Sequence, residues 1–222
     1  MVNLPSLAIG VPPYRLTGTV YGVLANDRAL VERLGDSVNQ PPYKAPPKAP
    51  VLYLKPRNTH AMSGSVMAMP EDIGQLALGA SLALVIGRVA CRVTEQDALK
   101  HVSGATLVAD IKVPHESFYR PSVRFNARDG SCLIGPAVVP LEQLESIDSL
   151  QVAVTVNAEC MPVSTRLVRS AARLLADVTE FMTLLPGDVL MLGVPANMPT
   201  LKSGDRFTIE ADGIGRLEGA LA

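Results

Sequence analysis

Two stretches of the chain carry basic side chains with few acids to offset them. The first, residues 37–70, has no Asp or Glu, and in the second, residues 112–128, Glu116 is the only acid. Ammonium and guanidinium groups bind carboxylates through charge-assisted hydrogen bonds, so the pattern indicates a cleft for a substrate with two or three carboxylates. A solvated loop is the alternative for the first stretch. The candidate substrate-binding residues are Lys55, Arg57, Arg120, Arg124 and Arg128.

Lys55 and Arg57 directly follow Val51–Leu54, an apolar run typical of a strand. Side chains two residues apart on a strand point to the same side, so both would face one way if the strand continues through Pro56. We therefore expect Lys55 and Arg57 to face a concave site rather than bulk solvent.

The chain lacks the common catalytic signatures. Residues 79–83, Gly-Ala-Ser-Leu-Ala, come near a nucleophile elbow but lack its last Gly, and strand continues where a helix should begin. Gly213-Ile214-Gly215 predicts a turn between terminal strands, because it lacks the third-Gly spacing and the helix of a dinucleotide loop. The three His and three Cys show no metal-ligand spacing, and the Cys are expected to be free thiols.

The composition is that of a folded, nearly neutral protein. The 222 residues are 48% hydrophobic and 18% charged, which supplies enough apolar surface for a core and argues against general disorder. A net charge of −1 argues against nucleic acid as the main partner. The longest uncharged run, residues 73–87, is too short to span a membrane, and the first residues lack the basic region of a signal peptide. We expect a cytoplasmic protein.

Short strands joined by Gly and Pro turns dominate the predicted elements. Residues 151–157 alternate between apolar and polar and give the best strand signal. One long helix is predicted over residues 167–182, and a short one over 27–34 with Asn26 as its cap. No alternation of strand and helix appears, so we predict a mixed β-roll or β-sandwich with few helices, built as an N-terminal arm (1–16) and one domain (17–222). The other predicted elements are strands at 17–25, 81–93, 189–194 and 206–211 and a short helix at 94–101.

Eight short segments occur in an order and spacing that a known family shares. They are Tyr53–Thr59, Leu82–Gly87, Ala109-Asp110, Phe118–Pro121, Arg128–Gly130 with Ile134–Pro136, Leu185–Asp188, Leu192–Pro195 and Gly213–Gly215. Together they resemble the fumarylacetoacetate hydrolase family, from about residue 17 to the C-terminus. Within it, residues 42–48 running into Lys-Pro-Arg-Asn-Thr resemble one branch. That branch is the N-terminal half, or separate N-terminal subunit, of the bifunctional isomerase/decarboxylase of homoprotocatechuate (4-hydroxyphenylacetate) degradation.

The resemblance implies the fold of that family and chemistry on 2-oxo acids that passes through a dienolate. In the family a Mg²⁺ or Mn²⁺ ion stabilises the developing charge, held by two Glu on one strand and an Asp on a later strand. Here the register places Gly79 and Ser81 at the two Glu positions, and only Asp110 keeps its carboxylate. We expect a vestigial site that holds neither ion tightly, with Asp110 hydrogen-bonded or paired with a neighbouring base. Three further replacements are Leu30 for an expected His, Asn126 for a Lys and Val194 for a Thr.

Three functional hypotheses remain open. In the first, which the resemblance implies, the chain is a subunit in the decarboxylation of 5-carboxymethyl-2-oxo-hex-3-ene-1,7-dioate and the isomerisation of 2-hydroxyhepta-2,4-diene-1,7-dioate. It would work with a homologous metal-bearing chain or as a homo-oligomer. In the second, it is a non-catalytic structural partner of a metal-bearing homologue. In the third, it is a stand-alone, metal-free keto–enol isomerase that relies on Lys or Arg electrostatics.

Overall fold

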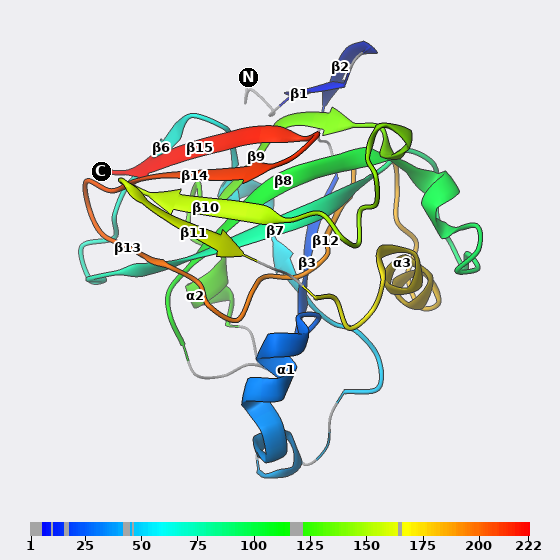
Figure 1. Cartoon of the computed structure of the whole chain (residues 1–222), viewed down its shortest axis with the longest axis horizontal. Coiled ribbons are helices and arrows are strands. Elements are labelled where there is room, and N and C mark those ends of the chain that lie inside the picture. The colour runs from blue at the N-terminus through cyan, green and yellow to red at the C-terminus, as the bar shows by residue number, and fades with distance from the viewer. Residues whose placement is uncertain are drawn as a thin grey trace.

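Two β-sheets make up most of the fold (Figure 1). The computed structural model describes residues 6–9, 11–15, 18–41, 45, 47–115, 122–163 and 166–222. The predicted mixed β architecture with few helices is confirmed.

The larger sheet has ten strands and holds the candidate site. Its order is β2-β1-β9-β8-β7-β12-β3-β4, with β13 paired to β7 and β5 paired to β9. Its strands are β1 (Ser6–Ile9), β2 (Val11–Arg15), β3 (Val20–Leu24), β4 (Val51–Lys55), β5 (His60–Met62), β7 (Leu76–Ile86), β8 (Val102–Lys112), β9 (Cys132–Val139), β12 (Val189–Met191) and β13 (Thr200–Leu201).

The smaller sheet has five strands in the order β11-β10-β14-β15-β6 and lies across one face of the larger sheet (Figure 1). The residues predicted to alternate form β10, where Val152 and Val154 are buried and Ala153 and Thr155 are only partly buried. The strands of the smaller sheet are β6 (Ser65–Met67), β10 (Val152–Val156), β11 (Glu159–Val163), β14 (Arg206–Ala211) and β15 (Gly215–Leu221).

The main core lies between the two sheets. Leu78 and Leu82 of β7 pack in one apolar cluster with Phe207 and Ile209 of β14, and all four are buried. Because strand side chains alternate, the intervening β7 residues face the other side of the sheet. A second cluster of buried aliphatic residues, which includes Val85 and its neighbours on β8 and β12, covers that side. The candidate site lies on this second face.

The helices are few and short: α1 (Arg28–Leu34), α2 (Val123–Asn126) and α3 (Ala171–Thr179). The predicted cap of α1 is wrong by one residue, because Asp27 Oδ1 accepts from the backbone N–H of Leu30 at 2.9 Å. Asn26 instead donates from Nδ2 to the carbonyl of Leu192 at 2.7 Å, which ties the start of α1 to the end of β12. The predicted end of this helix at residue 34 is confirmed, and Gly35 follows it with φ of +46°.

α3 is much shorter than the predicted helix over residues 167–182. It begins at Ala171, where Ser170 caps it by accepting from the N–H of Arg173 at 3.2 Å. It ends at Thr179, whose carbonyl accepts from the N–H of Arg92 at 2.7 Å. Helical hydrogen bonding continues briefly beyond it, since the N–H of Met182 donates to the carbonyl of Val178 at 3.3 Å. The predicted start is lost because Leu167 bridges to Asp27 and the N–H of Val168 donates to the carbonyl of Asn26 at 2.9 Å.

Three other predicted elements have shifted boundaries. The buried strand predicted over 81–93 is β7, which begins earlier, at Leu76, and ends at Ile86 before Gly87. The predicted helix over 94–101 is reduced to a 3₁₀ helix at Ala98–His101. The strand predicted over 189–194 ends at Met191.

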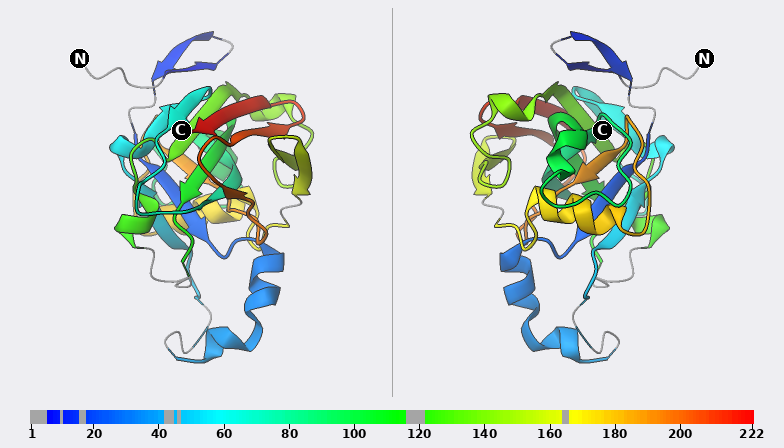
Figure 2. Two further views of the ribbon diagram at one scale, coloured as in Figure 1. Left: turned by 90° about the vertical axis from the view of Figure 1, so that its left-hand side faces the viewer. Right: turned by 90° about the vertical axis from the view of Figure 1, so that its right-hand side faces the viewer.

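β1 and β2, which lie in the predicted N-terminal arm, form a hairpin. β1 and β2 pair antiparallel, and β1 also pairs in parallel with β9, Ala8 with Ala137. Figure 2 shows this hairpin standing at one end of the molecule and α1 projecting from the other. The proposed boundary between arm and domain, residues 16 and 17, lies outside the described residues. No helix formed by the described residues is long and apolar enough to cross a membrane.

Candidate functional site

A buried ion pair between Lys55 and Asp110 forms the centre of the site. Neither side chain has any exposed surface, and Lys55 Nζ lies 2.8 Å from Asp110 Oδ1. The ammonium also donates to the carbonyls of Ile111 and Asn126, at 3.0 and 2.7 Å, and to Ser131 Oγ at 3.3 Å. Its hydrogen bonds are thus directed at these oxygens, and its contact with Oδ1 is an electrostatic one. Lys55 is a satisfied interior residue.

Tyr53 supplies a hydrogen bond to the other oxygen of the same carboxylate. Its hydroxyl donates to Asp110 Oδ2 at 2.5 Å. The tyrosine ring crosses Gly22, its partner on β3, where a Cβ would lie 2.1 Å from the ring. Burial raises the pKa of Tyr53 well above its usual value, and the charge of Asp110 and the hydrogen bond to it raise it further, so the hydroxyl stays a donor.

Lys112 is a second ammonium on the same carboxylate. It lies two residues after Asp110 on β8, so both side chains leave the same face of the sheet. Its Nζ lies 3.4 Å from Asp110 Oδ2 and 5.6 Å from the centre of the Tyr53 ring. Burial alone would raise the pKa of Asp110, but the charges of Lys55 and Lys112, the short contact with Lys55 and the hydrogen bond from Tyr53 outweigh it and hold the pKa well below its usual range.

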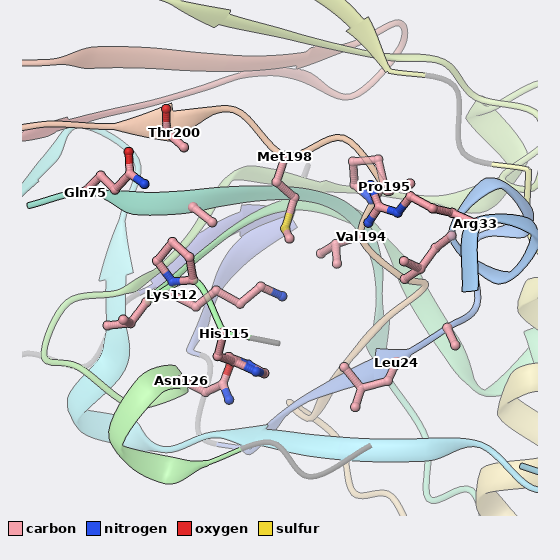
Figure 3. A pocket seen from close by; sticks show the side chains of 16 residues that line it. Leu24, Arg33, Gln75, Lys112, His115, Asn126, Val194, Pro195, Met198 and Thr200 are labelled. Carbon is pink, nitrogen blue, oxygen red and sulfur yellow. The ribbon is translucent and has the colours of Figure 1, made fainter. Parts of the chain in front are cut away.

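A cavity of about 280 Å³ opens beside Lys112. Figure 3 shows the Lys112 side chain running into it with the ammonium toward Met198, while Arg33 enters from the opposite side on α1. The remaining walls are largely apolar, and the described lining contains no Asp or Glu. Other lining residues that bear polar groups are Gln75, His115, Asn126 and Thr200.

The positions at which the family resemblance implied polar groups converge on this cavity. Leu30, Asn126 and Val194, which stand in place of an expected His, Lys and Thr, all line it. Gly79 lies directly across from Asp110 in the β7–β8 pairing. The structure thus brings Leu30, Asn126 and Val194 to one cavity.

The donor set around Asp110 does not fit a Mg²⁺ or Mn²⁺ ion. Gly79 offers no side-chain oxygen, and Ser81 Oγ donates to the carbonyl of Leu82 at 2.7 Å. A Cβ added at Gly79 would lie 2.8 Å from Val194 Cγ1, so that side chain already fills the space beside the strand. Among the described residues, no three His, Cys, Asp or Glu side chains gather closely enough to hold a metal. Hard divalent cations need several oxygen ligands, and one carboxylate already paired with two ammonium groups does not provide them.

The proposed substrate-binding residues do not share one location. β4 ends at Lys55, and Pro56 leads into a 3₁₀ helix at Arg57–Thr59. The strand therefore does not continue through Pro56, and Arg57 is exposed while Lys55 points inward. Lys55 and Arg57 therefore do not point to the same side, because the strand on which that expectation depended ends at Lys55.

The remaining predicted bases lie elsewhere. Arg124 and Arg128 both reach toward Asp72, at 3.6 and 3.7 Å, outside the cavity lining. Arg120 lies outside the described residues. The cavity is instead lined by Lys112 and Arg33. Lys112 belongs to the second basic stretch, which indicated a substrate-binding cleft, whereas nothing about the short helix that contains Arg33 indicated a binding role.

Comparisons with known proteins agree with this geometry. Residues 19–222 match the family described as fumarylacetoacetate (FAA) hydrolase C-terminal. The chain is 37% identical over 205 residues to the 4-hydroxyphenylacetate degradation bifunctional isomerase/decarboxylase of Escherichia coli, covering 91% of this chain and 47% of that protein. It thus spans about half the length of the curated relatives of this kind that it matches.

Solved structures share the fold. Fumarylpyruvate hydrolase from Pseudomonas aeruginosa, in complex with Mn²⁺ and pyruvate, superposes with a TM-score of 0.81 at 23% identity and covers 99% of this chain and 96% of that one. The 5-carboxymethyl-2-hydroxymuconate delta-isomerase from Mycobacterium smegmatis gives a TM-score of 0.77 at 26% identity, covering 93% of this chain and 79% of that one. With a family match over nearly its whole length, the chain belongs to the fumarylacetoacetate hydrolase family.

Proposed function

We propose that this chain is a subunit of an isomerase/decarboxylase of 4-hydroxyphenylacetate catabolism, acting with a homologous metal-bearing chain in the cytoplasm. The assembly would decarboxylate 5-carboxymethyl-2-oxo-hex-3-ene-1,7-dioate and isomerise 2-hydroxyhepta-2,4-diene-1,7-dioate. In this proposal the chain supplies a folded half and a metal-free cavity, and the partner supplies the divalent cation.

The observation that carries this proposal is the length of the match. The chain aligns along nearly all of itself with about half of a bifunctional relative, which favours a role for it as one half of a two-part enzyme. The state of Asp110 supports the second part of the proposal. A carboxylate that is buried and paired with Lys55 and Lys112 has lost the open oxygens that a hard cation needs.

A purely structural role is the alternative, since a degenerate site can persist as a folded scaffold. The cavity argues for more than that, because it combines Lys112 and Arg33 with no described acid in its lining. Crystals of the assembly soaked with a dicarboxylate would separate the two roles. Density in this chain's cavity would support a binding role, and density in the partner's site alone would support the structural one.

The test of the main proposal compares the chain alone with the chain mixed with a homologue that keeps both metal-ligating Glu. Decarboxylation is followed by release of CO₂ and isomerisation by the change in ultraviolet absorbance of the diene. We expect little turnover from this chain alone with Mg²⁺, strong turnover from the mixture, and loss of activity on chelation. Turnover by the purified chain with micromolar Mg²⁺ and no partner would refute the degenerate-site proposal.

A further inference from the structure

The buried charges beneath the cavity do not cancel. Lys55 and Asp110 have no exposed surface and Lys112 is only 8% exposed, so two ammonium groups share one carboxylate. Asp110 is fully engaged by its three neighbours. Because a buried charge is costly unless it is paired, this arrangement leaves one positive charge that an anion would balance.

The uncompensated charge resides on Lys112 rather than on Lys55. Lys55 directs three hydrogen bonds to oxygens of the surrounding structure. Lys112 also has three N–H donors, but its described hydrogen bonding consists of one long contact, 3.4 Å, with Asp110 Oδ2. The Tyr53 ring, 5.6 Å away, borders one side of the ammonium. The other side faces the cavity (Figure 3).

The lining of the cavity narrows the chemistry of an occupant. Ala77, Val194 and Met198 form apolar walls, Arg33 adds a second positive charge at the other side, and no acid is found among the described lining residues. A volume of about 280 Å³ lies near the lower end of ligand pockets, which suits a molecule of a few carbons. The molecule that fits is a small carboxylate with a short apolar body. The cavity leaves room near Arg33 for a second carboxylate on it.

We propose that the Lys112 ammonium takes over the electrostatic role of the family's divalent cation and anchors the 2-oxo-carboxylate end of a small di- or tricarboxylate. This assignment rests on the proposed function for the identity of the natural substrate, but not for the binding of the anion itself. Asp110 then acts as a positioning residue, because it holds the ammonium that touches the ligand. Gly79 pairs with Asp110 and lies on the same face of the sheet as Asp110 and Lys112. Because Gly79 has no side chain, no Glu at this position competes for the Lys112 ammonium.

The proposal is tested by calorimetry with 2-oxoglutarate, a five-carbon 2-oxo dicarboxylate, on the chain alone in buffer containing a chelator. We expect saturable binding that weakens as the salt concentration rises, and no binding of the neutral dimethyl ester of 2-oxoglutarate. Lys112→Met should lower the affinity at least tenfold, while the matched control Lys100→Met, at an exposed lysine far from the cavity, should leave it unchanged. Lys112→Arg, which keeps the charge, should retain most of the affinity and serves as the second variant if Lys112→Met does not fold.

Two results would overturn the proposal: no binding of 2-oxoglutarate by the wild-type chain, or equal binding by wild type and both Lys112 variants. Binding that appears only when Mg²⁺ is added would also contradict it, because the ammonium would then not replace the cation. These outcomes are independent of the proposed function. A chain that binds the anion but never supports turnover with any partner would leave the anion site standing and remove the enzymatic role.

Discussion

Two lysines contact the same buried carboxylate, and replacing each should have opposite consequences. Lys55→Met removes an ammonium that pairs with Asp110 and donates to two backbone carbonyls and to Ser131. Lys112→Met removes an ammonium whose only described hydrogen bond is a long one. The first change should strongly destabilise the fold, and the second should leave stability nearly unchanged while removing one of the cavity's two positive charges.

The size of the first effect follows from the burial. Breaking a buried ion pair by removing one partner costs about 3–5 kcal/mol, since an uncompensated charge remains. Lys112 still lies 3.4 Å from Asp110 after Lys55 is lost, so we expect a value near the lower end, about 3 kcal/mol. For a chain of this size that corresponds to a fall in Tm of roughly 6–12 °C. Lys112→Met restores neutrality to the buried pair, so its effect should lie within about 1 kcal/mol of zero.

The assay is urea unfolding of wild type, both variants and the exposed control Lys100→Met, with the free energies of unfolding compared at equal m-values. Combining Lys55→Met with Asp110→Asn should destabilise less than the sum of the single changes, because both single changes remove the same contact between Lys55 and Asp110. Equal destabilisation by Lys55→Met and Lys112→Met would refute the division between a structural and a ligand-facing lysine. So would a Lys55→Met variant as stable as wild type.

Three further outcomes are expected. The depressed folded-state pKa of Asp110 contributes stability that is present above about pH 4 and lost as pH falls further, so Asp110→Asn should flatten the acid limb of stability measured by urea unfolding from pH 7 to 3. The double change Gly79→Glu with Ser81→Glu should not restore Mn²⁺ binding in calorimetry until Lys112→Ala and Val194→Ala are added, since the Lys112 ammonium pairs with Asp110 and Val194 Cγ1 would lie 2.8 Å from the new Cβ at position 79. Burial raises the pKa of Cys132 to about 12, so its thiol should resist a disulfide reagent in the native chain, while the two exposed cysteines react.

The sequence predicted best those strands that have one face buried in the core and the other face more exposed. β10 lies in the smaller sheet with one face on the core, so its alternation reports burial directly. β14 matches its predicted bounds of 206–211 for the same reason. β7 is buried on both faces along all its residues, so periodicity could not fix where it begins. The predicted long helix lost its first residues because Leu167 and Val168 pair with Asp27 and Asn26, contacts that no local pattern contains.

The candidate site was predictable in part, through positions rather than through side-chain roles. In the structure, Leu30, Asn126 and Val194, three positions singled out by the family register, line one cavity, and Gly79 pairs with Asp110 across β7 and β8. What local sequence could not provide was the partner of each base. A lysine that pairs with a buried carboxylate and a lysine that faces a cavity look alike in a basic stretch, and only the pairing of β7 with β8 and the position of β4 separate them.

The replacements in this site depend on one another physically. A divalent cation needs several carboxylates to offset its charge and dehydration. A lysine ammonium needs only one carboxylate, because it is covalently attached to the chain. Losing the two Glu while keeping Asp110 would leave a buried carboxylate with an incomplete site, and Lys112 beside it supplies a positive charge without a metal. The same exchange alters the possible chemistry: an ammonium can orient a carboxylate and stabilise a developing oxyanion, but it cannot chelate a 2-oxo acid through two inner-sphere bonds. In the proposed assembly, this arrangement would let the chain hold an anionic substrate, and the proposed metal-bearing partner would activate it.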